Sequence, residues 1–97
     1  MREANIKLIL FSSFLGAIRE GVRAIAYDYY DDLISIYGYM SRDPDGEDYD
    51  VIDFAITEVM ASCPQFSRQK IELVKTEESV GKLDPHKGWI FVRYEPV

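Results

Sequence analysis

Residues 22–40 read VRAIAYDYY-DD-LISIYGYM, and this stretch decides the fold. Apolar residues recur with a period of two on both sides of Asp31-Asp32, which indicates two β-strands. In the second run, Ile34, Ile36 and Met40 share one face of the strand. Aspartate suits a tight turn because its side chain bonds its own backbone. The stretch therefore predicts an antiparallel β-hairpin.

A helix is predicted on each side of this hairpin, because apolar residues there recur at helical spacing. The first helix is expected over residues 3–19, ended by Gly21. The second is expected to begin near Asp48 or Tyr49 and to end at Cys63-Pro64, since proline does not continue a helix. The apolar stripe of the first helix, expected to be almost wholly covered, is Leu8, Phe11, Leu15 and Ile18, widened by Ile9 and Phe14. The apolar face expected for the second helix is Val51, Phe54, Ala55, Val59 and Met60.

The C-terminal third alternates again and indicates two further strands. Ile71 and Leu73 interleave with Glu72 and Val74, and a loop over residues 77–88 follows. In the closing strand, residues 89–94, one face is expected to carry Ile90 and Val92 and the other Trp89, Phe91 and Arg93. We therefore predict a single α+β domain over residues 1–97, in the order α-β-β-α-β-β. Its four-stranded antiparallel sheet is expected to carry both helices on one face.

The composition is that of an ordinary globular domain. The chain has 97 residues, of which 47% are hydrophobic and 29% charged, which matches folded proteins rather than disordered ones. Its one cysteine, Cys63, excludes an intramolecular disulfide and a Cys-rich zinc site, and fits a cytoplasmic protein. The apolar stretch at residues 6–15 is too short to span a bilayer, so we interpret it as a core helix rather than a signal peptide.

The acidity of the chain is concentrated in one segment. Between Asp28 and Asp53 there are nine acidic residues and one basic residue, Arg42, a net charge of −8, whereas the whole chain carries −6. Five tyrosines lie in the same segment. An acidic chain is not expected to bind nucleic acid or an anionic membrane surface. A local negative field does suit a cationic partner.

Motifs for chemistry are few. Residues 41–52 resemble a calcium loop, but Ile52 stands where the closing glutamate is needed, so no metal is expected. His86 is the one histidine and falls in a turn, and Cys63 is expected to be a buried thiol. No phosphate-binding glycine loop or cofactor motif is present. Acids in turns and helix starts stay solvated and ionised, so a carboxylate-dependent hydrolase is disfavoured and no enzyme is expected.

Short motifs along almost the whole chain resemble small acidic bacterial immunity proteins of contact-dependent growth inhibition and other polymorphic toxin systems. These motifs are Phe14-Leu15-Gly16 with Val22-Arg23-Ala24-Ile25, Asp45-Gly46-Glu47, Thr57-Glu58-Val59-Met60-Ala61 with Pro64, and Gly88-Trp89-Ile90-Phe91-Val92-Arg93. One departure is the proline-bearing loop at residues 41–44. The resemblance implies a protein that binds a cognate toxin and blocks its active site or substrate surface.

Charge and resemblance together predict an immunity protein that neutralises a basic, nuclease-type toxin by mimicking its anionic substrate. The candidate partner-binding residues are Asp28, Tyr29, Tyr30, Asp31, Asp32, Asp43, Asp45, Glu47, Asp48, Tyr49 and Asp50. They form one surface only if the hairpin end, the loop and the second helix start lie on one side. Alternatives are a solvated face without a partner, and an adaptor or homodimer that pairs through a strand edge within residues 22–40. A small hydrolase is the least favoured.

Overall fold

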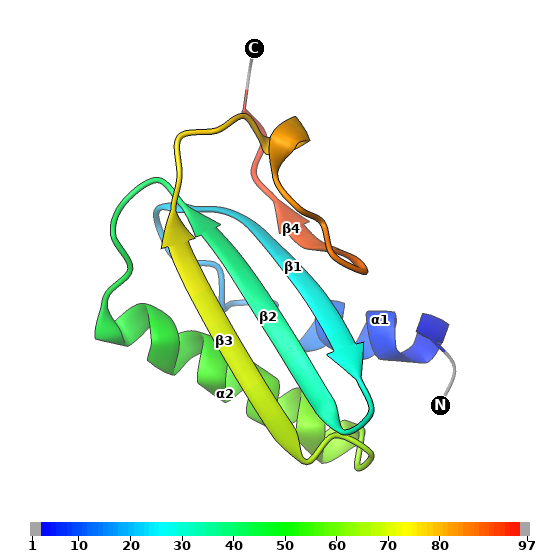
Figure 1. Cartoon of the computed structure of the whole chain (residues 1–97). Helices are drawn as coiled ribbons and strands as arrows, with labels where there is room; N and C mark the ends of the chain where they lie inside the picture. The colour runs from blue at the N-terminus through cyan, green and yellow to red at the C-terminus, as the bar shows by residue number, and fades with distance from the viewer. Residues whose placement is uncertain (1–2, 96–97) are drawn as a thin grey trace.

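The predicted hairpin is the centre of a four-stranded sheet (Figure 1). The computed structural model describes residues 3–95. Strand β1 spans Val22–Tyr30 and β2 spans Leu33–Met40, paired antiparallel from one end to the other. Between them Asp31 has a φ of 54°, the left-handed conformation that aspartate tolerates in a two-residue turn. The hairpin prediction is confirmed.

The predicted order of elements is also confirmed. Helix α1 spans Glu3–Ser13, α2 spans Gly46–Ser62, β3 spans Arg68–Lys75 and β4 spans Gly88–Val92. A short 3-10 helix, η1 at Val80–Lys82, lies within the last loop. The strand order across the sheet is β3-β2-β1-β4, and both helices lie on the same face of it (Figure 1).

The sheet is mixed rather than wholly antiparallel, because β3 runs parallel to β2. Helix α2 has 17 residues and is therefore about 25 Å long. Strand β2 has eight residues and is also about 26 Å long. The helix thus returns the chain to the end of the sheet where β2 began. From there β3 can pair with β2 only in the parallel direction.

This order leaves β1 and β2 as inner strands, each paired on both sides. The outer strands of the sheet are β3 and β4. The homodimer given as an alternative would pair through residues 22–40, where β2 is paired on both sides and β1 is paired with β4 only over Ala24–Ala26.

The core lies between the sheet and the helix layer. It is built from the apolar residues that both layers bury, chiefly Ile6, Leu10 and Phe14 of the N-terminal segment, Ile25, Tyr27, Ile34 and Ile36 of the hairpin, and Ile52, Ile56 and Val59 of α2. Ala24 and Ala26, on the other face of β1, are also fully buried. The hairpin therefore supplies the most enclosed part of the molecule.

Helix α1 is shorter than the predicted helix 3–19, and its expected apolar stripe is only partly buried: Phe14 is buried, and Ile9 and Ile18 pack against the core. Helix α1 ends at Ser13, and the chain turns at Gly16, whose φ is 85°, before it reaches Gly21. The buried positions are Ile6, Leu10 and Phe14. Three residues of the expected stripe are exposed instead: Leu8, Phe11 and Leu15. Because this segment is apolar on nearly every side, its spacing alone did not select the buried face.

One residue of α2 and the last strand also differ from the prediction. Phe54 is exposed, whereas Ile52 and Ile56 on either side of it are fully enclosed. Strand β4 ends at Val92 rather than at residue 94. The pairing of β4 with β1 shifts register between Ile25 and Ala26. This shift interrupts the alternation of side chains along β4, so that Ile90 and Phe91 both pack against the core. A β-bulge has this effect because it inserts one extra residue into a strand.

The packing of β3 against β2 should be sensitive to one glycine. A Cβ on Gly38 would lie 2.5 Å from Cδ2 of Leu73, which is buried. We expect Gly38→Ala to lower the free energy of unfolding by about 1–3 kcal/mol, as overpacking does. Urea denaturation measures this value.

Two further variants test the cause. Gly81→Ala places its Cβ in open space and should change stability by less than about 1 kcal/mol. The double variant Gly38→Ala/Leu73→Val should lose less stability than the two single changes together. Additive losses would contradict the proposed clash.

Candidate functional site

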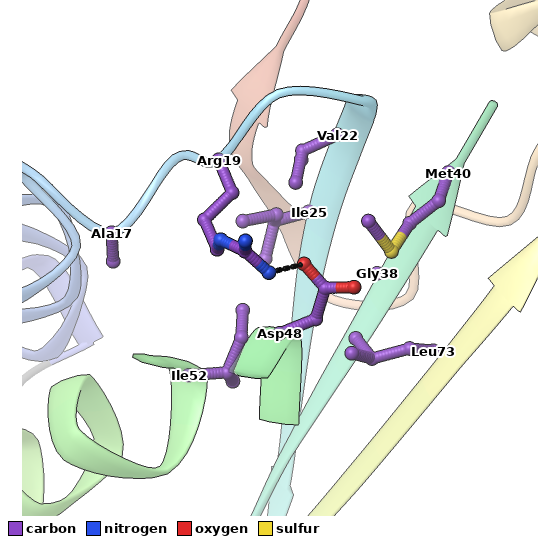
Figure 2. Close-up of a pocket in the computed structure, with 9 residues that line it drawn as sticks. All are labelled: Ala17, Arg19, Val22, Ile25, Gly38, Met40, Asp48, Ile52 and Leu73. Atoms are coloured by element: carbon purple, nitrogen blue, oxygen red, sulfur yellow. Dashed lines mark hydrogen bonds and ion pairs between the residues drawn. The ribbon is translucent and has the colours of Figure 1, made fainter. Parts of the chain in front are cut away.

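One of the eleven predicted site residues is buried and locked by two arginines. Asp48, the third residue of α2, is 3% exposed. Its Oδ1 accepts hydrogen bonds from Nη1 of Arg19 at 2.6 Å and from Nη2 of Arg42 at 2.8 Å. Its Oδ2 accepts from Nη1 of Arg42 and from the backbone N–H of Asp45, both at 2.8 Å. Figure 2 shows the carboxylate directed toward Arg19, with Ile25 and Met40 nearby.

These contacts make Asp48 part of the framework rather than of a free surface. The hydrogen bonds from Arg42, and then those from Asp45 and Arg19, hold the pKa of the Asp48 carboxyl well below its usual range, although burial opposes them. Asp45 caps α2 in return, because its carboxylate accepts from the backbone N–H of Asp48. The void beside this cluster is about 10 Å³, room for about one water. It is not a ligand site.

Around this buried acid lies a group of exposed residues, which we call the α2 acidic surface. It consists of Asp43, Asp45, Glu47, Tyr49 and Asp50. Arg19 pairs with Asp45 and Glu47 at 3.1 and 2.5 Å. Both of these acids are largely exposed, so the ion pairs are weak. The surface therefore keeps a negative field.

The other predicted acids lie at the turn between β1 and β2, where we call them the hairpin-end group: Asp28, Tyr29, Tyr30, Asp31 and Asp32. Asp32 accepts hydrogen bonds from Arg68 at 2.7 Å and from Ser67 at 2.9 Å, and these contacts lower its pKa. Tyr29 packs against the ring of Phe66. Tyr30 and Asp31 are exposed.

The structure does not bring these two groups together. Strand β2 begins beside the hairpin turn and ends before the loop that leads to α2 (Figure 1). Its eight residues separate the two groups by about 26 Å. The predicted residues therefore form two separate surfaces, at opposite ends of the sheet.

Sequence reasoning missed an apolar groove between α1 and α2. Leu15 of the turn after α1 lines it together with Asp50, Val51, Phe54 and Glu58 of α2, and it is an open hollow of about 360 Å³. The available signal was that residues 6–15 are apolar on nearly every side of a helix, with Lys7, Ser12 and Ser13 as the polar positions. A two-layer domain covers only one side of each helix, so some of these side chains had to face outward.

Other chemistry is sparse in the described part of the chain. Over residues 3–95, no group of three or more His, Cys, Asp or Glu side chains is placed to hold a metal ion. Cys63 is buried, and burial raises the pKa of its thiol. His86 stacks on Tyr37 with ring centroids 3.6 Å apart. Neither α1 nor α2 is long and apolar enough to cross a membrane.

The Asp48 cluster generates a stability prediction. Asp48→Asn removes the charge that Arg19 and Arg42 share. It should lower the free energy of unfolding at pH 7 by about 3 kcal/mol, because a buried ion pair is broken. The control is Asp50→Asn, an exposed acid on the same helix, which should change stability by less than about 0.5 kcal/mol. Equal losses in the two variants would contradict a structural role for Asp48.

The comparison of wild type with Asp48→Asn also predicts how the stability should depend on pH. The pKa of Asp48 is lower in the folded than in the unfolded state, so its ionised form stabilises the fold above about pH 4. This contribution is lost as the pH falls through the folded-state value. The stability gap between wild type and Asp48→Asn should therefore shrink steadily below about pH 4. A gap that stays constant from pH 7 to pH 2 would show that the charge of Asp48 does not stabilise the fold.

Comparison with known proteins places the chain in a family. The model of a family described as MafI2 immunity protein matches residues 3–95. The search of curated proteins found no match. This family match confirms the resemblance to immunity proteins of polymorphic toxin systems that the motifs predicted.

Solved structures are only distantly similar. A copper form of a MamM CTD variant has 11% identity and a TM-score of 0.45, covering 78% of this chain and 100% of that chain. A zinc form of another MamM CTD variant has 15% identity and a TM-score of 0.39, covering 76% and 86%. These values are too low to support an argument about this chain. Its family rests on the match over residues 3–95, by which the chain belongs to the MafI2 immunity protein family.

Proposed function

We propose that this protein neutralises its cognate MafB toxin by binding a basic, nuclease-type toxin domain through the α2 acidic surface. Membership in the MafI2 immunity family implies a cognate toxin as the partner. Proteins of this family are toxin inhibitors rather than enzymes. The nuclease activity of the toxin and the surface that meets it are the parts proposed here. We further propose that the encounter takes place in the cytoplasm, where a nuclease would reach its substrate.

One observation carries this proposal: near the start of α2, one acid is buried and paired with arginines, while neighbouring acids are exposed. Asp48 is buried and neutralised by Arg19 and Arg42. Within residues 3–95, Asp43 and Asp50 form no ion pair, and both are exposed. The arginines therefore hold the loop in place while other carboxylates remain free to meet a partner.

An acidic surface of this kind fits a partner that normally binds a polyanion. A nuclease domain carries Lys and Arg where it contacts phosphates, because neutralising phosphate charge supplies most of the affinity for nucleic acid. Carboxylates presented by an inhibitor can occupy the same cationic positions. Complementary charge also speeds the encounter and rejects partners of like charge. Tyr49, exposed among these acids, adds contact area at low entropic cost.

The hairpin-end group is a weaker candidate for the same role. Asp32 is already bonded to Arg68 and Ser67. Asp28 is half-buried and lies 4.0 Å from Nδ1 of His86. Within this group only Tyr30 and Asp31 are exposed, so this end presents less free negative charge.

Charge reversal tests the proposal. Asp43→Lys/Asp50→Lys should slow association with the purified cognate toxin domain by about tenfold or more, because steering depends on the local field. The matched control is Glu77→Lys/Glu78→Lys, which changes the net charge equally at two exposed acids of the last loop. It should slow association about twofold or less. Stopped-flow or surface plasmon resonance measures both rates.

The remaining outcomes separate the alternatives. Raising the salt to ~0.5 M shortens the Debye length to roughly 4 Å, so wild-type association should slow toward the rate of the Asp43→Lys/Asp50→Lys variant. Equal slowing by both charge reversals would mean that only net charge matters. A larger effect of Asp31→Lys would assign the contact to the hairpin end. A wild-type protein that neither binds nor inhibits the toxin domain would refute the proposed function.

A further inference from the structure

We infer that the groove between α1 and α2 anchors an apolar segment of the toxin domain that is flanked by lysine or arginine. This inference rests on the proposed function, and it adds the part of the contact that charge does not supply. The groove lies on the outer side of the helix layer, and Asp43 is not among the residues that line it.

The helix layer leaves four large apolar side chains in solvent. Leu8 is 65% exposed, Phe11 41%, Leu15 81% and Phe54 70%. Leu8 and Phe11 are three residues apart in α1 and so lie on one side of that helix, and Leu15 follows in the turn after it. Single exposed apolar residues are common, but clusters of them mark sites of interaction.

These side chains are not left over from a poorly packed core. Phe14 and Ala17, on either side of Leu15 and Gly16, are both buried. The turn that separates them depends on Gly16, with a φ of 85°, and on a hydrogen bond from the backbone N–H of Ala17 to the carbonyl of Phe14 at 3.0 Å. The fold therefore closes its core and holds Leu15 outward in the same turn.

Leu15 and Phe54 meet at the groove although they come from different elements. Both line the space of about 360 Å³ together with Val51 and Ala55. A second groove of about 390 Å³, lined by Leu8 and Ile9, adjoins it through the shared residues Ser13 and Glu58.

Charge decides what this groove receives. The titratable side chains that line the two grooves are acidic, Asp50 in the first and Glu58 in both. In a two-fold contact between copies of this chain, the same acids would face one another and repel. A segment with an apolar anchor between cationic side chains can contact the apolar lining of the groove and pair with its two acids, Asp50 and Glu58. Asp50 also belongs to the α2 acidic surface, so one basic partner can contact both surfaces at once.

The test uses the full chain and the purified cognate toxin domain. Leu15→Ser/Phe54→Ser should weaken the Kd about tenfold or more, as loss of a buried apolar anchor does. The change should appear mainly as faster dissociation, while the salt dependence of association stays that of wild type. The control Val74→Ser/Tyr94→Ser alters two exposed residues outside the helix layer and should leave the Kd within about twofold of wild type.

Each remaining result decides the matter. Thermal unfolding confirms that the variants fold, and Leu15→Ala/Phe54→Ala serves as a milder pair. If the groove variant binds like wild type while Asp43→Lys/Asp50→Lys does not, the groove inference is overturned and the proposed function stands. If wild type sediments as a dimer that Leu15→Ser/Phe54→Ser dissociates, the groove takes a second copy and the inference is overturned. If wild type does not bind the toxin domain, the proposed function and the groove inference both fail.

Discussion

The buried carboxylate of Asp48 is the interaction on which the arrangement of this molecule depends. Arg19 reaches it from the segment before β1, and Arg42 reaches it from the loop after β2. Its backbone belongs to the first turn of α2, which Asp45 caps. One side chain thus joins three segments that are distant in sequence. A buried acid is tolerated here because its oxygens are supplied with charged donors.

The position of α2 follows from this cluster and organises both surfaces of interest. The start of α2 displays the exposed acids, and its middle carries Phe54 on the outer side. Its inner side buries Ile52, Ile56 and Val59 against the hairpin. The same helix therefore completes the core, returns the chain for the parallel strand β3 and carries exposed acids beside exposed apolar side chains. In the proposed toxin complex, complementary charge speeds association and buried apolar contacts slow dissociation.

Much of the fold was predictable from local patterns. The hairpin followed from alternation around Asp31-Asp32, and the end of α2 followed from Cys63-Pro64. The direction of β3 was not predictable from its own residues, since parallel and antiparallel strands share the same alternation and differ only in how the chain returns. The exposed face of α1 was not predictable either. Its apolar residues lie on nearly every side, and only contact with α2 and the sheet selects Ile6 and Leu10, rather than Leu8 and Phe11, for burial.

The sequence by itself determined the order of elements and the local concentration of acid, because periodicity and charge are properties of neighbouring residues. Tertiary structure alone decided which acids remain free. Asp48 and Asp50 are two residues apart and chemically identical, yet one is enclosed by Arg19 and Arg42 and the other faces solvent. That difference depends on arginines brought from distant segments. Local sequence does not encode such contacts, since they arise only when the chain has closed around its core.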